Sequence, residues 1–374
     1  MISVLIPDGE DPLALEVVRS LGRAPRVRVD LLSADRRPTA RFSRFCRRCH
    51  PATCSLTEPE RLQAVLARLE RSRYDVLLPV SVAGCRLVSR ANHLLAPHVA
   101  LPPLACPETL DTANDKTALA RLAARYEVPV PASLVFPDQR SDNGALSRLT
   151  FPVLFKPPSL EGGRGIRRFE DRDTLARFLE THPSAQNGRR YLVQSYIEGS
   201  DLGLNVLCRE GEILAWTVQR AVHEAARPFG VAQGVSFYRD DRVLELGRRL
   251  LSAMGWTGVA NLDFRRCGAT GEINLLEMNP RFWGTLMGSV HAGVNFPYLA
   301  CLAALGRPAP PLDYRPTVYA DTKITLQHFL GAIAGSPRIP GLRLPHTRLW
   351  AAATDPLPAA AFRWCRALRK PRSR

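Results

Sequence analysis

Lysine is scarce in this chain of 374 residues. Among 51 basic residues, the only lysines are Lys116, Lys156, Lys323 and Lys370, so all the others are arginines. Because lysine offers a compact point charge that arginine does not replace, a chain that prefers arginine should keep lysine where such a charge is needed. The net charge of +16 also indicates an anionic partner: a nucleotide, an acidic substrate, a membrane surface or a nucleic acid.

The chain also lacks a long apolar run and a basic leader. No uninterrupted stretch reaches the roughly 18 apolar residues that cross a bilayer. The N-terminal segment contains acidic residues at Asp8, Glu10 and Asp11, whereas a signal peptide begins with basic residues followed by an apolar stretch. We therefore expect a cytoplasmic protein with reduced thiols, in keeping with nine cysteines, an odd number. The length and a hydrophobic share of 45% predict two or three folded domains.

One cluster of cysteines combines Cys46, Cys49, His50 and Cys54. The C-x-x-C-H spacing matches a haem-attachment pattern, but haem attachment normally requires export. A Zn²⁺ site is chemically feasible, although adjacent Cys49 and His50 are not usual ligand spacing and no second C-x-x-C follows. We favour a basic loop without a ligand, because short cysteine patterns often occur by chance.

Short apolar segments alternate with helical periodicity in the first 110 residues. Strands are predicted at 2–6, 27–32 and 75–79, and helices at 12–21, 58–72 and up to about 95. Such alternation predicts a parallel, doubly wound sheet, and hence a Rossmann-like domain. A G-x-G-x-x-G turn is missing, so we do not expect a dinucleotide there.

The pattern then changes to α+β with mostly antiparallel pairs. Helices are predicted at 115–127 and 241–254, strands at 151–158 and 191–197, and hairpins at 202–208 with 212–219 and at 259–267 with 272–279. From about residue 309 the chain becomes rich in proline and arginine. The basic, aromatic-containing end predicts a solvated tail, with contact to an anionic surface as the alternative.

The last hairpin carries the strongest chemical signal. Side chains alternate along strands, so pairing through the turn near 268–271 places Asp263 beside Glu277, with Asn279 on the same face. Two carboxylates and an amide oxygen suit Mg²⁺ that also holds phosphates. Arg281 continues the series and adds a cation beside the metal.

Two further motifs precede this hairpin. Lys156 ends an apolar strand and is followed by a loop with Gly162, Gly163 and Gly165, whose backbone N–H groups are able to approach an anion closely. This is not a Walker A motif, because the lysine precedes the glycines. The strand that contains Gln194 then ends in a polar loop, a place where backbone groups contact a base and a carboxylate contacts a ribose.

In this order the motifs resemble the ATP-grasp superfamily, especially its carbamoyl-phosphate-synthase-like and biotin-carboxylase-like members. The resemblance covers about residues 1–300, and E-M-N-P-R after N-x-D is its most specific element. It implies four parts: a Rossmann-like pre-ATP-grasp domain at 1–112, a small subdomain with a glycine-rich lid at 113–195, a large subdomain with the Mg²⁺ site at 196–310, and a Pro/Arg-rich extension at 311–374.

The resemblance also implies the roles of individual residues. Lys116 and Lys156 would contact ATP phosphates under the lid that contains Gly162, Gly163 and Gly165. Adenine would be bordered by Gln194, Tyr196 and Ile197, and ribose would be held by Asp201. Mg²⁺, or Mn²⁺ as the alternative, would be bound by Asp263, Glu277 and Asn279, and Arg281 would stabilise a phosphorylated intermediate. Lys156 and Arg281 are the expected catalytic residues. Arg220, His223 and Arg227 follow a strand and are candidates for substrate contact, whereas His291 is expected to be structural.

The implied reaction is the ATP-dependent ligation of a carboxylate to an amine through an acyl phosphate. The expected partners are therefore small molecules and not nucleic acids. Two alternatives remain open: a phosphotransferase on the same fold, and a non-catalytic binder of polyanions or membrane surfaces. A ligase needs both a carboxylate and an amine for turnover, whereas a kinase needs one acceptor.

Overall fold

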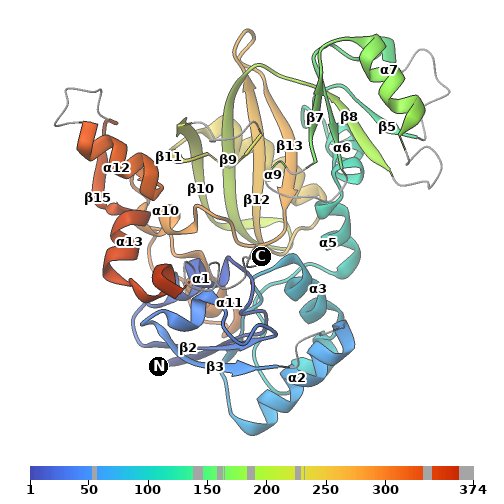
Figure 1. The fold of residues 1–374 in the computed structure, drawn as a ribbon. Coiled ribbons are helices and arrows are strands. Elements are labelled where there is room, and N and C mark those ends of the chain that lie inside the picture. Colours follow the sequence, from blue (N-terminus) through green and yellow to red (C-terminus); the bar gives the residue numbers. More distant parts are fainter. Residues whose placement is uncertain are drawn as a thin grey trace, which may run out of the picture.

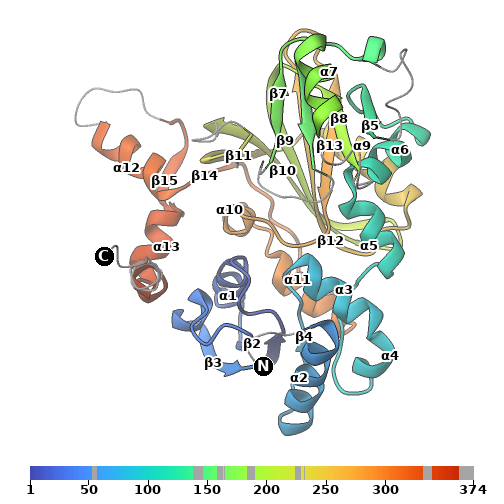
Figure 2. The same cartoon turned by 45° about the vertical axis from the view of Figure 1, so that its right-hand side comes forward.

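The fold is described from a computed structural model. It covers residues 1–52, 57–137, 146–157, 163, 165–182, 190–223, 229–230, 232–331 and 339–361. Within these ranges the strands form three sheets of four, seven and four strands. The views in Figures 1 and 2 place the N-terminal sheet below the large sheet and the small sheet beside the upper end of the large one. None of the helices in these ranges has the length and apolar character needed to cross a membrane.

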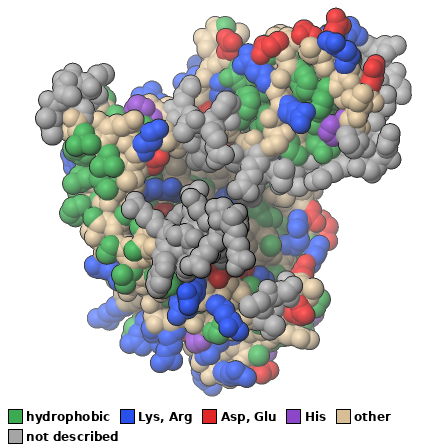
Figure 3. Space-filling view, viewed as in Figure 1, with side chains coloured by type: hydrophobic (Ala, Val, Ile, Leu, Met, Phe, Trp, Pro, Cys, Tyr) green, Lys and Arg blue, Asp and Glu red, His purple; other side chains and the backbone are tan. Residues whose placement is uncertain are grey.

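The N-terminal domain has a parallel sheet in the order β3-β2-β1-β4. Its strands are β1 (Ile2–Ile6), β2 (Val27–Ser33), β3 (Cys46–Pro51) and β4 (Val76–Leu77), and its helices are α1 (Ala14–Leu21), α2 (Glu58–Arg71), α3 (Val82–Arg90), α4 (Asn92–Leu95) and the 3-10 helix η1 (Thr39–Phe42). The predicted parallel α/β domain is confirmed. On the face viewed in Figure 3, Lys and Arg side chains gather over this lower part of the molecule.

The prediction of a loop at Cys46–His50 is wrong, because these residues form the edge strand β3. Arg47 donates to both oxygens of the buried Asp30 on β2, at 2.8 and 2.7 Å, and so secures the edge pairing. Local periodicity does not reveal a strand whose pairing depends on such a contact. Burial raises the pKa of Cys46 to about 12. Cys54 lies outside the described residues, and within them no group of three His, Cys, Asp or Glu side chains is arranged to hold a metal.

The small sheet has the order β5-β8-β6-β7 and is antiparallel where its strands pair. Its strands are β5 (Ser133–Phe136), β6 (Val153–Lys156), β7 (Arg167–Phe169) and β8 (Tyr191–Ser195); the neighbouring helices are α5 (Pro107–Asn114), α6 (Lys116–Arg125), α7 (Arg172–Thr181) and η2 (Leu146–Arg148). Aromatic rings fill its core, with Phe155 stacked on Tyr191 at 4.6 Å between ring centroids. Asp115 caps α6 by accepting from the backbone N–H groups of Thr117 and Ala118.

The large sheet has the order β13-β12-β9-β10-β11-β14-β15. Its strands are β9 (Gly199–Arg209), β10 (Glu212–His223), β11 (Gly234–Tyr238), β12 (Gly258–Cys267), β13 (Ile273–Asn279), β14 (Thr317–Ala320) and β15 (Leu342–Thr347); the helices are α9 (Asp241–Ala253), α10 (Leu286–His291), α11 (Phe296–Ala304), α12 (Thr322–Gly331) and α13 (Arg348–Thr354). Both predicted hairpins are present. β14 pairs with β11, so this sheet continues beyond residue 310.

A shared hydrophobic core joins the N-terminal domain to the large sheet. Phe282, Trp283 and Phe296 belong to the same buried cluster as Val17 and Leu21 of α1. The Trp283 and Phe296 rings meet edge to face at 4.9 Å. Burial of large aromatic side chains stabilises such a junction strongly, so the segment that follows β13 is held firmly between the two parts.

Candidate nucleotide and metal site

The β12–β13 hairpin brings the three predicted metal ligands together. Asp263 and Glu277 are directly opposite each other in the antiparallel register. Nδ2 of Asn279 donates to Oδ2 of Asp263 at 3.2 Å and to Oε1 of Glu277 at 3.4 Å. Two carboxylates and one amide group therefore face a common point at the end of the hairpin.

The two carboxylates differ in how they hold a proton. Desolvation, reinforced by the neighbouring Glu277, raises the pKa of Asp263 to about 8. Desolvation also acts on Glu277, but the charge and hydrogen bond of Lys116, together with Lys156 and Asn279, outweigh it and lower the pKa of Glu277. Like charges placed across two strands repel each other. The raised pKa of Asp263 therefore favours one bound proton on the pair.

Lys116 and Lys156 come from two different elements, the helix α6 and the strand β6. Lys116 begins α6, and its Nζ lies 2.8 Å from Oε2 of Glu277. Lys156 ends β6, is 6% exposed, and donates from Nζ to Oε1 of Gln194 at 2.6 Å. Burial lowers the pKa of Lys156 to about 8. Lys116 thus meets a carboxylate, and Lys156 meets an amide oxygen.

Close packing explains one glycine of the predicted loop. Gly163 and Gly165 both have φ of +73°, a left-handed conformation that favours glycine. A Cβ atom on Gly163 would lie 2.0 Å from the carbonyl oxygen of Phe229, so a side chain does not fit there. Gly162 lies outside the described residues.

Arg265 organises the predicted adenine and ribose contacts, and sequence reasoning missed it. Its Nε donates to the carbonyl oxygen of Ile197 at 2.5 Å, and one Nη donates to the Tyr196 hydroxyl at 2.9 Å. The other Nη pairs with the carboxylate of Asp201. The sequence signal for this role is the alternation of side chains along β12: Arg265 follows Asp263 by two positions and therefore shares its face. Gln194, beside Lys156, is buried and also donates to Ser133 Oγ at 3.0 Å.

The structure describes three more of the predicted residues, Arg220, His223 and Arg281. The prediction that Arg220 and His223 follow a strand is wrong, because both belong to the end of β10 itself. Both are exposed, and the Arg220 guanidinium lies over the Tyr238 ring at 5.3 Å. Arg281 follows β13, and its Nη1 donates to the carbonyl oxygen of Phe282 at 2.6 Å. Arg227 lies outside the described residues.

His291 packs against aromatic rings, as expected for a structural histidine. Its ring lies 4.7 Å from that of His346 and 6.3 Å from that of Tyr319. Burial is the main cause that lowers the pKa of His291 to about 3. The imidazole therefore stays neutral at physiological pH.

A buried chain of hydrogen bonds leads away from the metal ligands across the sheet. Nδ2 of Asn279 donates to Asn261 at 3.1 Å, Nδ2 of Asn261 to Asn205 at 3.2 Å, and Nδ2 of Asn205 to the Thr217 hydroxyl at 3.1 Å. Thr217 in turn lies 3.2 Å from the Ser289 hydroxyl of α10. All five side chains are at most 9% exposed. The sequence did not predict this chain of contacts, which links four strands and a helix.

Comparison with known proteins shows which families this chain resembles. Residues 187–327 match the family described as "ATP-grasp in the biosynthetic pathway with Ter operon". The large chain of carbamoyl phosphate synthase from Thermomicrobium roseum is 26% identical over 272 residues, which is 69% of this chain and 24% of that protein. The chain thus spans about a quarter of the length of this relative.

Solved structures share the fold at low sequence identity. Biotin carboxylase from Campylobacter jejuni, solved as a β-γ-ATP complex, matches with a TM-score of 0.67 at 17% identity over 84% of this chain and 74% of that one. N5-carboxyaminoimidazole synthetase from Staphylococcus aureus, solved with ADP, matches with a TM-score of 0.64 at 14% identity over 91% and 90%. The resemblance to the ATP-grasp superfamily is confirmed, and this chain has the ATP-grasp fold.

Proposed function

We propose that this protein is an ATP-dependent ligase that joins a carboxylate to an amine through an acyl phosphate, with release of ADP and phosphate. The observation that carries the proposal is the meeting of Asp263, Glu277 and Asn279 beside Lys116. Similar structures solved with ADP and with β-γ-ATP support a nucleotide at this position. The proposed parts are the nucleotide-binding domains 113–195 and 196–310, the preceding domain 1–112 and the extension 311–374.

The donor set fits Mg²⁺, or Mn²⁺ as the alternative. Hard oxygen ligands suit both ions, and Mg²⁺ commonly takes one or two carboxylates together with substrate phosphates. Asp263 has a pKa of about 8, so the free pair retains a proton near neutral pH, and a divalent cation would replace that proton. When bound, the metal would neutralise charge on the ATP phosphates.

The hydrogen-bond chain allows Asn279 to present oxygen to the metal. Its Nδ2 faces both carboxylates, so a 180° turn of the amide would place Oδ1 there. The amides of Asn261 and Asn205 would turn with it, since each donates to the next. The chain ends on the hydroxyls of Thr217 and Ser289, and a hydroxyl either donates or accepts. In the reversed chain Asn261 and Asn205 therefore keep a hydrogen-bond partner on both sides.

The lysines would act by position and charge. Phosphoryl transfer needs an aligned acceptor and charge stabilisation more than covalent participation by the protein. Lys156, buried at the end of β6, would donate to ATP phosphate oxygens, and Lys116 would hold Glu277 and the phosphates in register. Arg281 would stabilise charge on the phosphorylated intermediate. Gly163 and Gly165 would belong to a lid that excludes water from the acyl phosphate.

The nucleoside would lie against the Arg265 contacts. Gln194, Tyr196 and Ile197 would border adenine, and Asp201 would accept from ribose hydroxyls. Arg265 already holds Tyr196, the Ile197 carbonyl and Asp201, so this wall is formed in advance. Arg220 and His223, exposed at the end of β10, would contact substrate only from the rim of the site.

The test is a two-component screen with Mg²⁺-ATP. Carboxylates and amines are pooled separately and together, and ADP and free phosphate are both measured. A ligase releases ADP and phosphate in equal amounts only when both pools are present. Production of ADP with one pool and without free phosphate would indicate a phosphotransferase instead. Salt-sensitive binding to polyanions that survives Asp263→Ala, without any turnover, would favour the non-catalytic alternative.

A further inference from the structure

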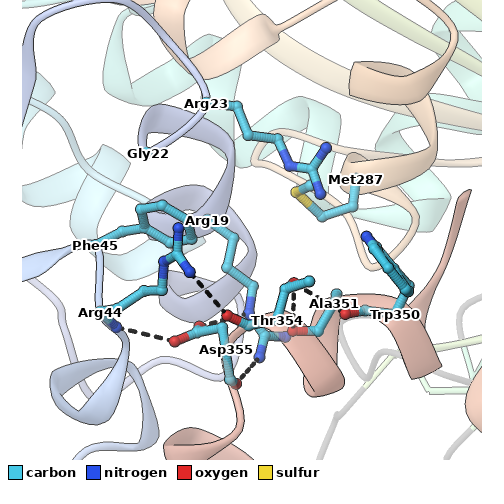
Figure 4. A pocket seen from close by; sticks show the side chains of 10 residues that line it. All are labelled: Arg19, Gly22, Arg23, Arg44, Phe45, Met287, Trp350, Ala351, Thr354 and Asp355. Atoms are coloured by element: carbon cyan, nitrogen blue, oxygen red, sulfur yellow. Dashed lines mark hydrogen bonds and ion pairs between the residues drawn. The ribbon is translucent and has the colours of Figure 1, made fainter. Parts of the chain in front are cut away.

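A cavity of about 300 Å³ lies between the N-terminal domain and the C-terminal segment. Its walls come from the end of α1, from residues 44–45, from α10 and from α13. None of its lining residues belongs to the candidate nucleotide and metal site. Figure 4 shows Arg23 reaching from the end of α1 toward Met287, with Trp350 on the neighbouring helix.

A buried ion pair forms a rigid base for this cavity. Nε of Arg19 lies 3.0 Å from Oδ2 of Asp355, and both side chains are at most 8% exposed. Asp355 also accepts from the Ser43 hydroxyl at 2.8 Å and from the backbone N–H of Arg44 at 2.9 Å. Asp355 is the only carboxylate of the lining, and these three donors hold both of its oxygens.

The positive charge of the lining consequently exceeds its negative charge. Arg19, Arg23 and Arg44 line the cavity against Asp355 alone. Arg44 donates to the carbonyl oxygen of Thr354 at 3.2 Å, whereas the Arg23 guanidinium has no hydrogen-bond or ion-pair partner within the described ranges. A guanidinium presents a planar set of donors that matches a carboxylate or a phosphate.

The other walls are flat and apolar. Met287 is 1% exposed and the Trp350 ring is 38% exposed, so the indole borders the open side of the cavity. Phe45 packs directly against Gly22, where a Cβ atom would lie 2.3 Å from the ring. Glycine at this position is therefore needed to let the ring close the wall. Apolar walls combined with charged groups that fix orientation occur in small-molecule sites, and this volume is near their lower limit.

We propose that this cavity binds a small ligand with a flat apolar body and one oxyanion group, a carboxylate or a phosphate. The oxyanion binds Arg23, and the body lies between Trp350 and Met287. Because α10 follows the segment of Arg281 directly, a ligand here contacts an element connected to the candidate active site. The proposal does not depend on ligase activity.

The test is calorimetric titration of the full chain with phenyl phosphate. Excess ADP and Mg²⁺ are present, so that the candidate nucleotide site is not accessible to the probe. We expect saturable binding that weakens at least about tenfold in Arg23→Gln, the usual effect of losing a charge-assisted hydrogen bond. Arg28→Gln, an exposed arginine on β2, is the matched control and should leave binding unchanged.

Three further probes separate the parts of the ligand. Benzoate tests whether a carboxylate replaces the phosphate. Inorganic phosphate and benzyl alcohol carry only the oxyanion or only the ring, and both should bind more weakly than phenyl phosphate. Trp350→Leu should weaken phenyl phosphate more than inorganic phosphate. Equal binding by Arg23→Gln and wild type, binding of benzyl alcohol as tight as that of phenyl phosphate, or no binding of either aromatic anion would overturn the proposal.

Discussion

Asn205 on β9 and Asn261 on β12 face each other in register, and Nδ2 of Asn261 donates to Oδ1 of Asn205 at 3.2 Å. Neither residue is one of the proposed metal ligands. Asn261 nevertheless accepts from Asn279, so the orientation of that amide is coupled to those of Asn261 and Asn205. The rigidity of a metal site depends on such supporting hydrogen bonds as much as on the ligands themselves.

We predict that Asn205→Leu weakens metal binding from a distance. It leaves the buried Asn261 amide without its acceptor, which costs about 1–3 kcal/mol of stability, and it frees Asn279 to misalign. Urea unfolding measures the first effect, and titration with Mg²⁺-ADP measures the second. Asn274→Leu is the control: Asn274 is buried on β13 but bonds Glu272, so only stability should fall. Unchanged Mg²⁺-ADP affinity in Asn205→Leu would contradict the supporting role.

We predict that Asp263→Asn stabilises the metal-free protein while it removes the response to metal. The substitution eliminates the repulsion between Asp263 and Glu277, which contributes to the raised pKa of Asp263. Thermal unfolding is measured with and without Mg²⁺ at pH 8.5, where both carboxylates of the wild type are largely ionised. The wild type should gain several degrees with Mg²⁺ and the variant none. A variant that retains the Mg²⁺ shift would argue against Asp263 as a ligand.

The lowered pKa of Lys156 predicts that nucleotide binding depends on pH. Its pKa is lowered from 10.5 to about 8 by burial, so the free protein loses this cation as pH rises through 8. Affinity for Mg²⁺-ADP should therefore fall by up to about tenfold per pH unit above 8. Lys156→Arg keeps its charge at all these pH values and should flatten the profile. A wild-type profile that coincides with that of Lys156→Arg up to pH 9.5 would exclude the assignment.

The same shift has the opposite sign for stability. The folded pKa lies below the ordinary value, so between pH 8 and 10.5 the unfolded chain binds the proton that the folded chain has released. Stability contributed by this group therefore rises with pH across that window. Lys156→Met removes the buried charge and should stabilise the nucleotide-free protein below pH 8, as measured by urea unfolding.

We predict that Arg265→Ala damages nucleotide binding and that its neighbour does not. Arg265 fixes Tyr196, the Ile197 carbonyl and Asp201, so its loss should weaken ADP binding about tenfold or more. Arg266 is the matched control, because it projects to the other face of β12 and pairs with Asp240 at 2.5 Å. Similar ADP affinity in Arg265→Ala and Arg266→Ala would show that Arg265 does not support nucleotide binding.

Local pattern was sufficient for the parts of the site that depend on one hairpin. The alternation of side chains along β12 and β13 and the short turn between the strands predict that Asp263, Glu277 and Asn279 share one face, as the pairing confirms. The alternation of apolar strands and helices was likewise enough for the parallel N-terminal sheet. In both cases neighbouring segments of the chain pair with each other.

Contacts between distant segments were not predictable in this way. The bond from Asn205 to Asn261 requires β9 to lie beside β12, and the edge strand β3 is fixed by Arg47 and Asp30 across β2. Likewise, the pairing of β14 with β11 brings a proline- and arginine-rich region into the large sheet. A single sequence specifies these neighbours only through tertiary packing, which overrides local propensity.

The central claim is that Asp263, Glu277 and Asn279 hold a divalent cation beside a nucleotide. The most direct measurement is a crystal structure with ADP and Mn²⁺, whose anomalous scattering locates the metal. We predict a peak within coordination distance of all three side chains, with Oδ1 of Asn279 turned toward it. Bound ADP with the Mn²⁺ peak elsewhere, or with Asp263 and Glu277 away from the metal, would contradict the claim.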